Sequence, residues 1–268
     1  MRRAWLLAVL LAGCDLVYGL EGRLPPEAQP GDEDGDGRLD ENDACPHIAN
    51  ESDVDLDVDG IAAECDPDDE DNTTMFRWFP IRDGLLGGDF SQMGTIGLVG
   101  DSLQFGADEV HTSWLFYDVD ATTMTIDVGF EVVSNAIENV SDYPWAELGI
   151  HTVNRGDDDV DRGSVCFVGV AQDTDEKPPI LGDAYLELKE DEQQKPHVSF
   201  EPPLNGTVGR LYQFRTTEKV RCGLARPGEV LLTASYDVTR PTTTGRFALS
   251  SDRITVKLTH IWLAWQPR

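Results

Sequence analysis

Apolar and polar residues alternate one by one along much of the C-terminal two thirds of the chain. The clearest case is Thr123–Val132, where every second side chain is apolar. Residues 253–258 alternate in the same way and continue into an apolar stretch that ends at Trp265. This alternation is typical of an antiparallel strand that has one face on a core and the other towards solvent. We therefore predict two long strands in these segments.

Shorter runs of the same kind recur between them, separated by Gly, Pro, Asn and Asp residues. Convincing helical periodicity is absent. Many short strands at this spacing predict a mainly β domain over residues 76–268, an antiparallel β-sandwich or jelly roll, and about 190 residues are ample for one core. The further predicted strands are Trp114–Tyr117, Trp145–His151, Ser164–Ala171, Asp183–Leu188, Val208–Phe214, Lys219–Leu224 and Glu229–Tyr236.

Residues 32–71 have a different pattern, with few apolar side chains and with aspartates set two residues apart. Asp-x-Asp-x-Asp-Gly occurs at residues 32–37 and again at 55–60, and a cysteine follows each copy. Such a segment cannot fold around an apolar core, so it needs counter-charge to become compact. Ca²⁺ takes about six to eight oxygen ligands from loops of this kind. We therefore predict calcium loops here rather than a solvated acidic linker.

The oxygen spacing also indicates which residues are ligands. The second loop has Ala63 at its ninth position, so that ligand is missing or replaced by water. No amphipathic helix flanks either loop, which argues against a helix–loop–helix calcium site. The predicted ligands are Asp32, Asp34, Asp36, the carbonyl of Arg38, Asp40 and Asp43 in the first loop, and Asp55, Asp57, Asp59, the carbonyl of Ile61 and Asp66 in the second.

On these motifs, together with Cys45-Pro46 and the run from Asp59-Gly60-Ile61 to Cys65-Asp66-Pro67, the segment 31–72 resembles thrombospondin type 3 repeats. The resemblance implies a chain wrapped around calcium with little regular secondary structure and stapled by disulfides. The chain departs from the family pattern at Ala44 and Ala63, and the second departure bears on the affinity of the second site.

The N-terminus has the features of an export signal. Met1-Arg2-Arg3 is basic, an apolar run follows, and Leu11-Ala12-Gly13-Cys14 matches the bacterial lipobox. In proteins with that motif, cleavage precedes the cysteine, which then carries lipid. We expect residues 1–13 to be a lipoprotein signal peptide, Cys14 to be lipidated and 14–30 to be a linker. The alternative is an ordinary signal peptide cut nearby. Localisation would be the bacterial cell envelope, with the leaflet left open.

The cysteine count agrees with export. Five cysteines are an odd number for a secreted protein. If Cys14 is acylated, the other four can pair as Cys45–Cys65 and Cys166–Cys222, which is consistent with an oxidising compartment. No other segment reaches the roughly 20 apolar residues that a membrane helix needs.

Charge and motifs exclude several function classes. The net charge of −29 argues against nucleic acid as a partner, because phosphate binding needs basic patches. Two-carboxylate glycan hydrolysis needs a suitably spaced acidic pair, and the nearest acidic strand, Glu187–Glu192, has the wrong spacing. We therefore expect no enzyme activity. Each of the five histidines is expected to be a surface or cross-strand residue rather than a ligand or base: His47, His111, His151, His197 and His260.

The strand pattern over 76–268 resembles the concanavalin A-like lectin and glucanase sandwich, through strand number, length and a long final strand. Binding of a glycan or a surface protein fits this architecture. Together with the calcium segment, it predicts a binding domain presented on a calcium-stiffened acidic stalk, by hypothesis in adhesion or surface organisation. The alternatives are a structural envelope protein without ligand and a divergent polysaccharide hydrolase. Sugar sites use aromatic platforms, although large aromatics are more often core. The available tryptophans are Trp78, Trp114, Trp145, Trp262 and Trp265.

Overall fold

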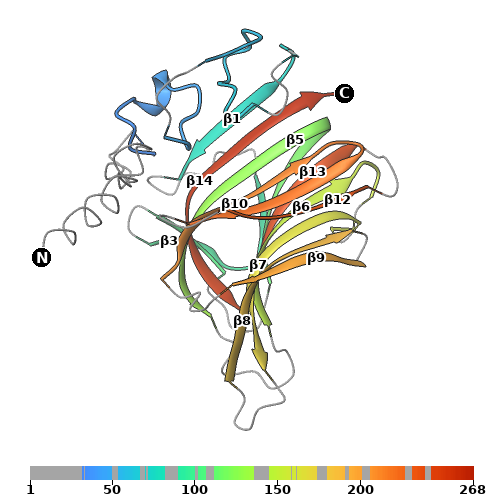
Figure 1. Ribbon diagram of the computed structural model, residues 1–268. Helices are drawn as coiled ribbons and strands as arrows, with labels where there is room; N and C mark the ends of the chain where they lie inside the picture. The colour runs from blue at the N-terminus through green and yellow to red at the C-terminus, as the bar shows by residue number, and fades with distance from the viewer. Residues whose placement is uncertain are drawn as a thin grey trace, which may run out of the picture.

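The protein is described here from a computed structural model (Figure 1). The described residues are 32, 34–49, 54–66, 70, 72–81, 90–99, 102–106, 112–135, 145–157, 159–160, 162–173, 180–190, 193–200, 206–226, 231–238 and 243–268. The predicted signal peptide, the lipidation site Cys14 and the linker 14–30 lie outside them.

Strands dominate these residues, as the alternating pattern predicts, and the one helix among them is a single 3₁₀ turn, η1 (Asp40–Asn42). No helix in this part of the chain is long and apolar enough to span a membrane. The strands are β1 (Met75–Pro80), β2 (Ser91–Met93), β3 (Ile96–Val99), β4 (Ser102–Phe105), β5 (Ser113–Asn135), β6 (Trp145–Asn154), β7 (Gly163–Asp173), β8 (Ile180–Glu190), β9 (Gln193–Phe200), β10 (Val208–Arg215), β11 (Lys219–Ala225), β12 (Leu232–Asp237), β13 (Thr244–Asp252) and β14 (Ile254–Pro267).

The strands form two antiparallel layers that share β5 (Figure 1). The second part of β5, from Ala121 onward, pairs with β14 and β10, which gives a front sheet in the order β1-β14-β5-β10-β11-β12. The first part of β5 pairs with β2 and β13, which gives a back sheet in the order β2-β5-β13-β6-β7-β8-β9. The prediction of an antiparallel β-sandwich is confirmed.

The core lies between the two sheets, and the alternation of side chains along each strand explains which residues form it. On β5, Ile126, Val128 and Phe130 are fully buried between the layers. The side chains between them point to the outer face of the front sheet, because successive side chains of a strand point to opposite faces. The disulfide Cys166–Cys222 crosses the core from β7 to β11, as expected from the cysteine count.

One part of the interior is polar. Arg215 and Gln213 on β10 point inward and are buried. The Arg215 guanidinium donates to the carbonyl of Thr152 (3.1 Å), to Ser164 Oγ (3.1 Å) and to Asn154 Oδ1 (2.7 Å). These bonds connect the front sheet to β6 and β7 of the back sheet and compensate for burying a charged group.

Some strands were not predicted. The predicted strands at 114–117 and 123–132 are parts of one strand, β5, because the polar stretch between them stays in the sheet while the strand passes from one layer to the other. The prediction missed β1, β2, β3, β4, β9 and β13. β9 contains Pro196 and is mostly polar, so its sequence lacks the alternating pattern of a strand. It lies at the end of the sheet order, next to β8, and an edge strand tolerates proline.

The acidic repeats do not stand away from the sandwich. Cys45–Cys65 closes a loop whose apolar side chains pack on the outer face of the front sheet. The expectation of a separate stalk is therefore wrong for this part of the segment, because a few apolar residues among the aspartates suffice to dock it. The buried cluster at this interface consists of Cys45, Ile61, Ala62, Cys65, Trp262 and Ala264, with Ala44, Ile48 and Trp78 packed against it.

Candidate calcium loops and the cavity beside them

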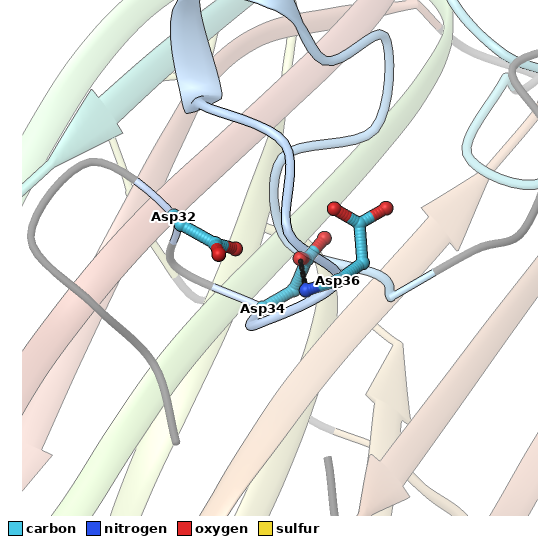
Figure 2. A group of neighbouring side chains, drawn as sticks. All are labelled: Asp32, Asp34 and Asp36. Carbon is cyan, nitrogen blue, oxygen red and sulfur yellow. Dashed lines mark hydrogen bonds between the residues drawn. The ribbon is translucent and has the colours of Figure 1, made fainter. Parts of the chain in front are cut away.

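The first three aspartates of each repeat lie together. One carboxylate oxygen from each of Asp32, Asp34 and Asp36 lies within 4.8 Å of the others, and Asp55, Asp57 and Asp59 form an equivalent group. Figure 2 shows the first group on a single turn of chain. Calcium–oxygen distances are about 2.3–2.6 Å, so two ligands on opposite sides of one ion are separated by about 5 Å. Both groups have spacing that one calcium ion can bridge.

The two loops have the same internal hydrogen bonds, which explains how the repeat sequence builds them. In the first, Gly37 N donates to Asp32 Oδ2 (3.2 Å) and Asp36 N donates to Asp34 Oδ1 (3.0 Å). In the second, Gly60 N donates to Asp55 Oδ2 (2.9 Å) and Asp59 N donates to Asp57 Oδ1 (3.3 Å). The glycine has φ of +96° and +97° respectively, a left-handed conformation that favours glycine.

Several carboxylate oxygens in the loops are buried and accept no hydrogen bond from the described residues. These include Asp32 Oδ1, Asp34 Oδ2 and Asp57 Oδ2. Buried carboxylate oxygens need a donor or a cation. Burial raises the pKa of Asp34 to about 7, and repulsion from the carboxylates of Asp36, Asp43 and Asp32 adds to the increase. The hydrogen bond from the Asp36 backbone N–H opposes it. A cation in the loop would supply the missing counter-charge, so the donor set fits calcium.

The other predicted ligands lie around these groups rather than within them. Asp40 is in η1, and Asp43 Oδ1 accepts from Cys45 N (2.8 Å). Arg38 N and Ile61 N donate to the fifth-position aspartates Asp36 and Asp59, both at 2.8 Å. Asp66 N donates to the carbonyl of Ala62 (3.0 Å), and the Asp66 side chain faces a cavity described below.

The second loop contains a strained residue. Val58 has φ of +67° where the first loop has Gly35 at +75°. A β-branched residue in the left-handed region is an outlier and costs about 1–2 kcal/mol. Val58 N is held by Asp55 Oδ1 (2.6 Å), and its side chain is 84% exposed, so only the loop's own bonds fix this conformation.

A histidine of the repeats, His47, contacts the front sheet directly. The His47 ring stacks on Trp262 with centroids 4.9 Å apart. The carbonyl of His47 accepts from Arg210 Nη1 (2.8 Å), and Arg210 also pairs with Asp127 at 3.3 Å. Arg210 therefore bridges the repeat segment and β5.

Asp127 is the centre of a buried polar cluster. His260 Nε2 lies 3.5 Å from its carboxylate and His47 Nε2 lies 3.8 Å from it. Burial alone would raise the pKa of Asp127, but Arg210 and the two histidines lower it to about 2. Burial, with repulsion from His260 and Arg210, lowers the pKa of His47 to about 3. The charges of Asp127 and Arg210 thus compensate each other, with His47 neutral.

A cavity of about 440 Å³ opens beside this cluster, between the second repeat and the front sheet. The repeats contribute His47, Ile48 and Glu64–Asp66. The front sheet contributes Thr125, Asp127, Arg210, Tyr212, Phe214 and Arg221, and Leu231 precedes β12. The cavity was not predicted from the sequence.

The predicted aromatic candidates lie elsewhere. Trp262 is fully buried beneath the repeats and Trp265 is 8% exposed in the core, while Trp78 packs beside Trp262. Trp114 stacks on Phe116 of the same strand, and Trp145 is 37% exposed on β6.

The expectation for the histidines holds for the strand residues His151 and His260, which make cross-strand contacts but are buried. It is wrong for His47, which is neither in a strand nor at the surface, because the repeats place it against Trp262. His111 lies outside the described residues, and the side chain of His197 is not described.

Comparison with solved structures gives the class of fold. The chain is similar to the winged bean acidic lectin complexed with methyl-α-D-galactose, with a TM-score of 0.51 and 8% identity over 72% of this chain and 99% of that chain. It is also similar to the Ca²⁺-bound exoplasmic/lumenal domain of VIP36, with a TM-score of 0.50 and 10% identity over 71% and 90% of the two chains. These likenesses show a concanavalin A-like β-sandwich. No protein-family model and no curated protein matches the chain.

Proposed function

We propose that this chain is a calcium-binding lipoprotein of the bacterial cell envelope, whose lectin-like sandwich binds a glycan or a surface protein in adhesion or surface organisation. The acidic repeats resemble thrombospondin type 3 repeats and would bind calcium through the two aspartate groups. The lipid would be carried by Cys14, and the protein would be held at the membrane by that lipid.

The observation that carries the calcium proposal is the pair of equivalent loops. Each places three carboxylates within reach of one ion, and each leaves buried carboxylate oxygens without a hydrogen-bond donor among the described residues. A solvated acidic linker is not expected to form the same turn twice, with a left-handed glycine at the same position each time. An ion that binds the loops only when they are folded would stabilise the docked state of the repeats.

A binding role is proposed in preference to catalysis. On β8, the carboxylates of Glu187 and Glu190 lie on opposite faces, because the two residues are an odd number of positions apart. Glu187 pairs with Lys189 at 3.5 Å, and Glu190 is buried on the other face. Glu187 and Glu190 therefore do not present a pair of carboxylates to one substrate, as glycan hydrolysis requires.

Calorimetric titration of calcium into the mature domain without Cys14, at physiological salt, tests the calcium proposal. Saturable binding at two sites is expected, and it should be abolished in the variant Asp34→Ala with Asp57→Ala. The matched control is Asp157→Ala with Asp237→Ala, which removes the same charge from exposed positions outside the loops. Equal weakening in both variants would reduce the effect to overall charge and refute the sites.

The anchor is tested separately by membrane fractionation. The full chain expressed in a bacterium should sediment with membranes, and Cys14→Ala should release it into the soluble fraction. A Cys14→Ala protein that remains at the membrane would contradict lipid anchoring.

A further inference from the structure

An aromatic ring forms part of the floor of the cavity between the second repeat and the front sheet. Tyr212 on β10 lies opposite Gly223 on β11 in the sheet register. A Cβ built on Gly223 would collide with Cε1 and Cζ of the Tyr212 ring. The ring therefore lies across the glycine, against the sheet. Phe214 is two residues further along the same strand and points to the same face.

The walls supply hydrogen-bonding groups of both kinds. The Arg221 guanidinium has no hydrogen bond or ion pair with the part of the chain that the structure describes, and it faces the cavity as a donor. Glu64 and Asp66 provide carboxylates from the repeat side. Arg210 and Asp127 are fixed by their pairing with each other and by the bond from Arg210 to the His47 carbonyl.

These groups favour a ligand with many hydroxyl groups and an apolar face. A pyranose ring stacks its C–H face on an aromatic ring and exchanges hydrogen bonds with carboxylates and guanidinium groups. The three acidic side chains of the lining outnumber its two arginines, and the whole chain carries a net charge of −29. An anionic glycan would be repelled by this field. The volume of about 440 Å³ lies within the usual range of ligand sites, about 300–1,000 Å³.

We propose that this cavity is a binding site for neutral oligosaccharides, with the front sheet as its floor and the second acidic repeat as one wall. The inference rests on the proposed function of the sandwich as a binding domain and specifies its site and ligand class.

The wall is connected directly to the second aspartate loop. Ile61 N donates to Asp59 Oδ1 (2.8 Å), and Ile61 is fully buried in the docking interface. The next turn is closed on the carbonyl of Ala62, which accepts from Cys65 N (2.9 Å) and Asp66 N (3.0 Å). Whatever orders Asp59 therefore also orders the cavity wall, so saccharide binding should depend on calcium.

The test uses the mature chain with calcium and an array of neutral gluco-, galacto- and manno-oligosaccharides of two to six units, followed by calorimetry with the bound probe. Tyr212→Ala and Arg221→Gln should each weaken binding at least tenfold, and chelation of calcium should weaken it as strongly. Trp145→Ala, which removes an exposed aromatic from the back sheet, is the matched control and should bind as the unchanged protein does.

Calcium binding and thermal unfolding that match the unchanged protein show that a variant is folded. If Tyr212→Ala does not fold, Arg221→Gln still tests the site. Neutral saccharide binding that survives both substitutions overturns this site but leaves the proposed function in place. Binding to anionic glycans or to a basic peptide alone overturns the ligand class. A calcium-loaded protein that binds no glycan overturns both this inference and the glycan part of the proposed function.

Discussion

Acid should destabilise this protein through two buried histidines. His47 lies between the repeats and the front sheet, and His151 lies on β6 with its Nε2 atom 2.8 Å from Ser250 Oγ. Burial lowers the pKa of both imidazoles to about 3. Both rings are therefore neutral in the folded state throughout the physiological range.

The size of the effect follows from proton linkage. In the unfolded chain a histidine has a pKa of about 6.5. Between pH 6.5 and 3 the unfolded state binds a proton that the folded state does not, so stability falls as the pH falls through this window. At pH 5.0 each histidine lowers the free energy of unfolding by about 2 kcal/mol relative to pH 7.5. The two together lower it by about 4 kcal/mol, a large share of the stability of a typical domain.

Urea denaturation at pH 7.5 and pH 5.0, with calcium at a fixed concentration, measures this difference. His47→Gln removes one titrating ring, so its loss between the two pH values should be about 2 kcal/mol smaller than that of the unchanged protein. The fixed cost of the substitution cancels, because it is present at both pH values. His151→Gln should behave in the same way.

An equal pH dependence in His47→Gln and the unchanged protein would refute this reasoning. It would mean that His47 takes up a proton without cost in the folded state, and hence that Asp127 balances a charged imidazole. If the variant with both His47→Gln and His151→Gln still lost about 4 kcal/mol between pH 7.5 and pH 5.0, the acid sensitivity would belong to other groups.

Three further predictions concern covalent and backbone features. Replacing Cys166 and Cys222 by Ala should lower the free energy of unfolding by about 4 kcal/mol in chemical denaturation, from the closure of a loop of 56 residues; an unchanged midpoint would contradict this. Gly129→Ala should destabilise by about 2 kcal/mol, because the new Cβ meets a histidine ring on β14, whereas Gly97→Ala has open space and should change little in the same assay. Val58→Gly should tighten calcium binding at the second loop about fivefold in calorimetry by removing about 1 kcal/mol of strain, and equal or weaker affinity would show that the loop is not strained.

The sequence predicted the features that depend on neighbouring residues. Alternation along Thr123–Val132 identified both the strand and the side chains that face the core, since strand geometry forces that pattern. The Asp-x-Asp-x-Asp-Gly register identified two loops that prove to have the same hydrogen bonds. The pairing Cys45–Cys65 and Cys166–Cys222, expected if Cys14 is acylated, is the pairing in the structure.

Features that depend on distant segments could not be predicted in this way. Asp127 occupies a polar position in an alternating strand, which predicts a solvent-facing side chain, yet it is 4% exposed because the repeats cover it. No local pattern shows that His47 will lie beside it. Tyr212 and Phe214 likewise occupy outward positions of β10, and only the docked repeat makes them the floor of a cavity.

The docking of the repeats on β14 also sets an order for assembly. Their contact surface, Trp262 and Ala264, is synthesised about 200 residues after the Cys45–Cys65 loop, and β14 must pair with β5 before that surface exists. Contacts this distant in sequence form slowly, because a long stretch of chain must first be closed into a loop. During synthesis the acidic loops therefore emerge long before the last strand, and they cannot dock until that strand has paired.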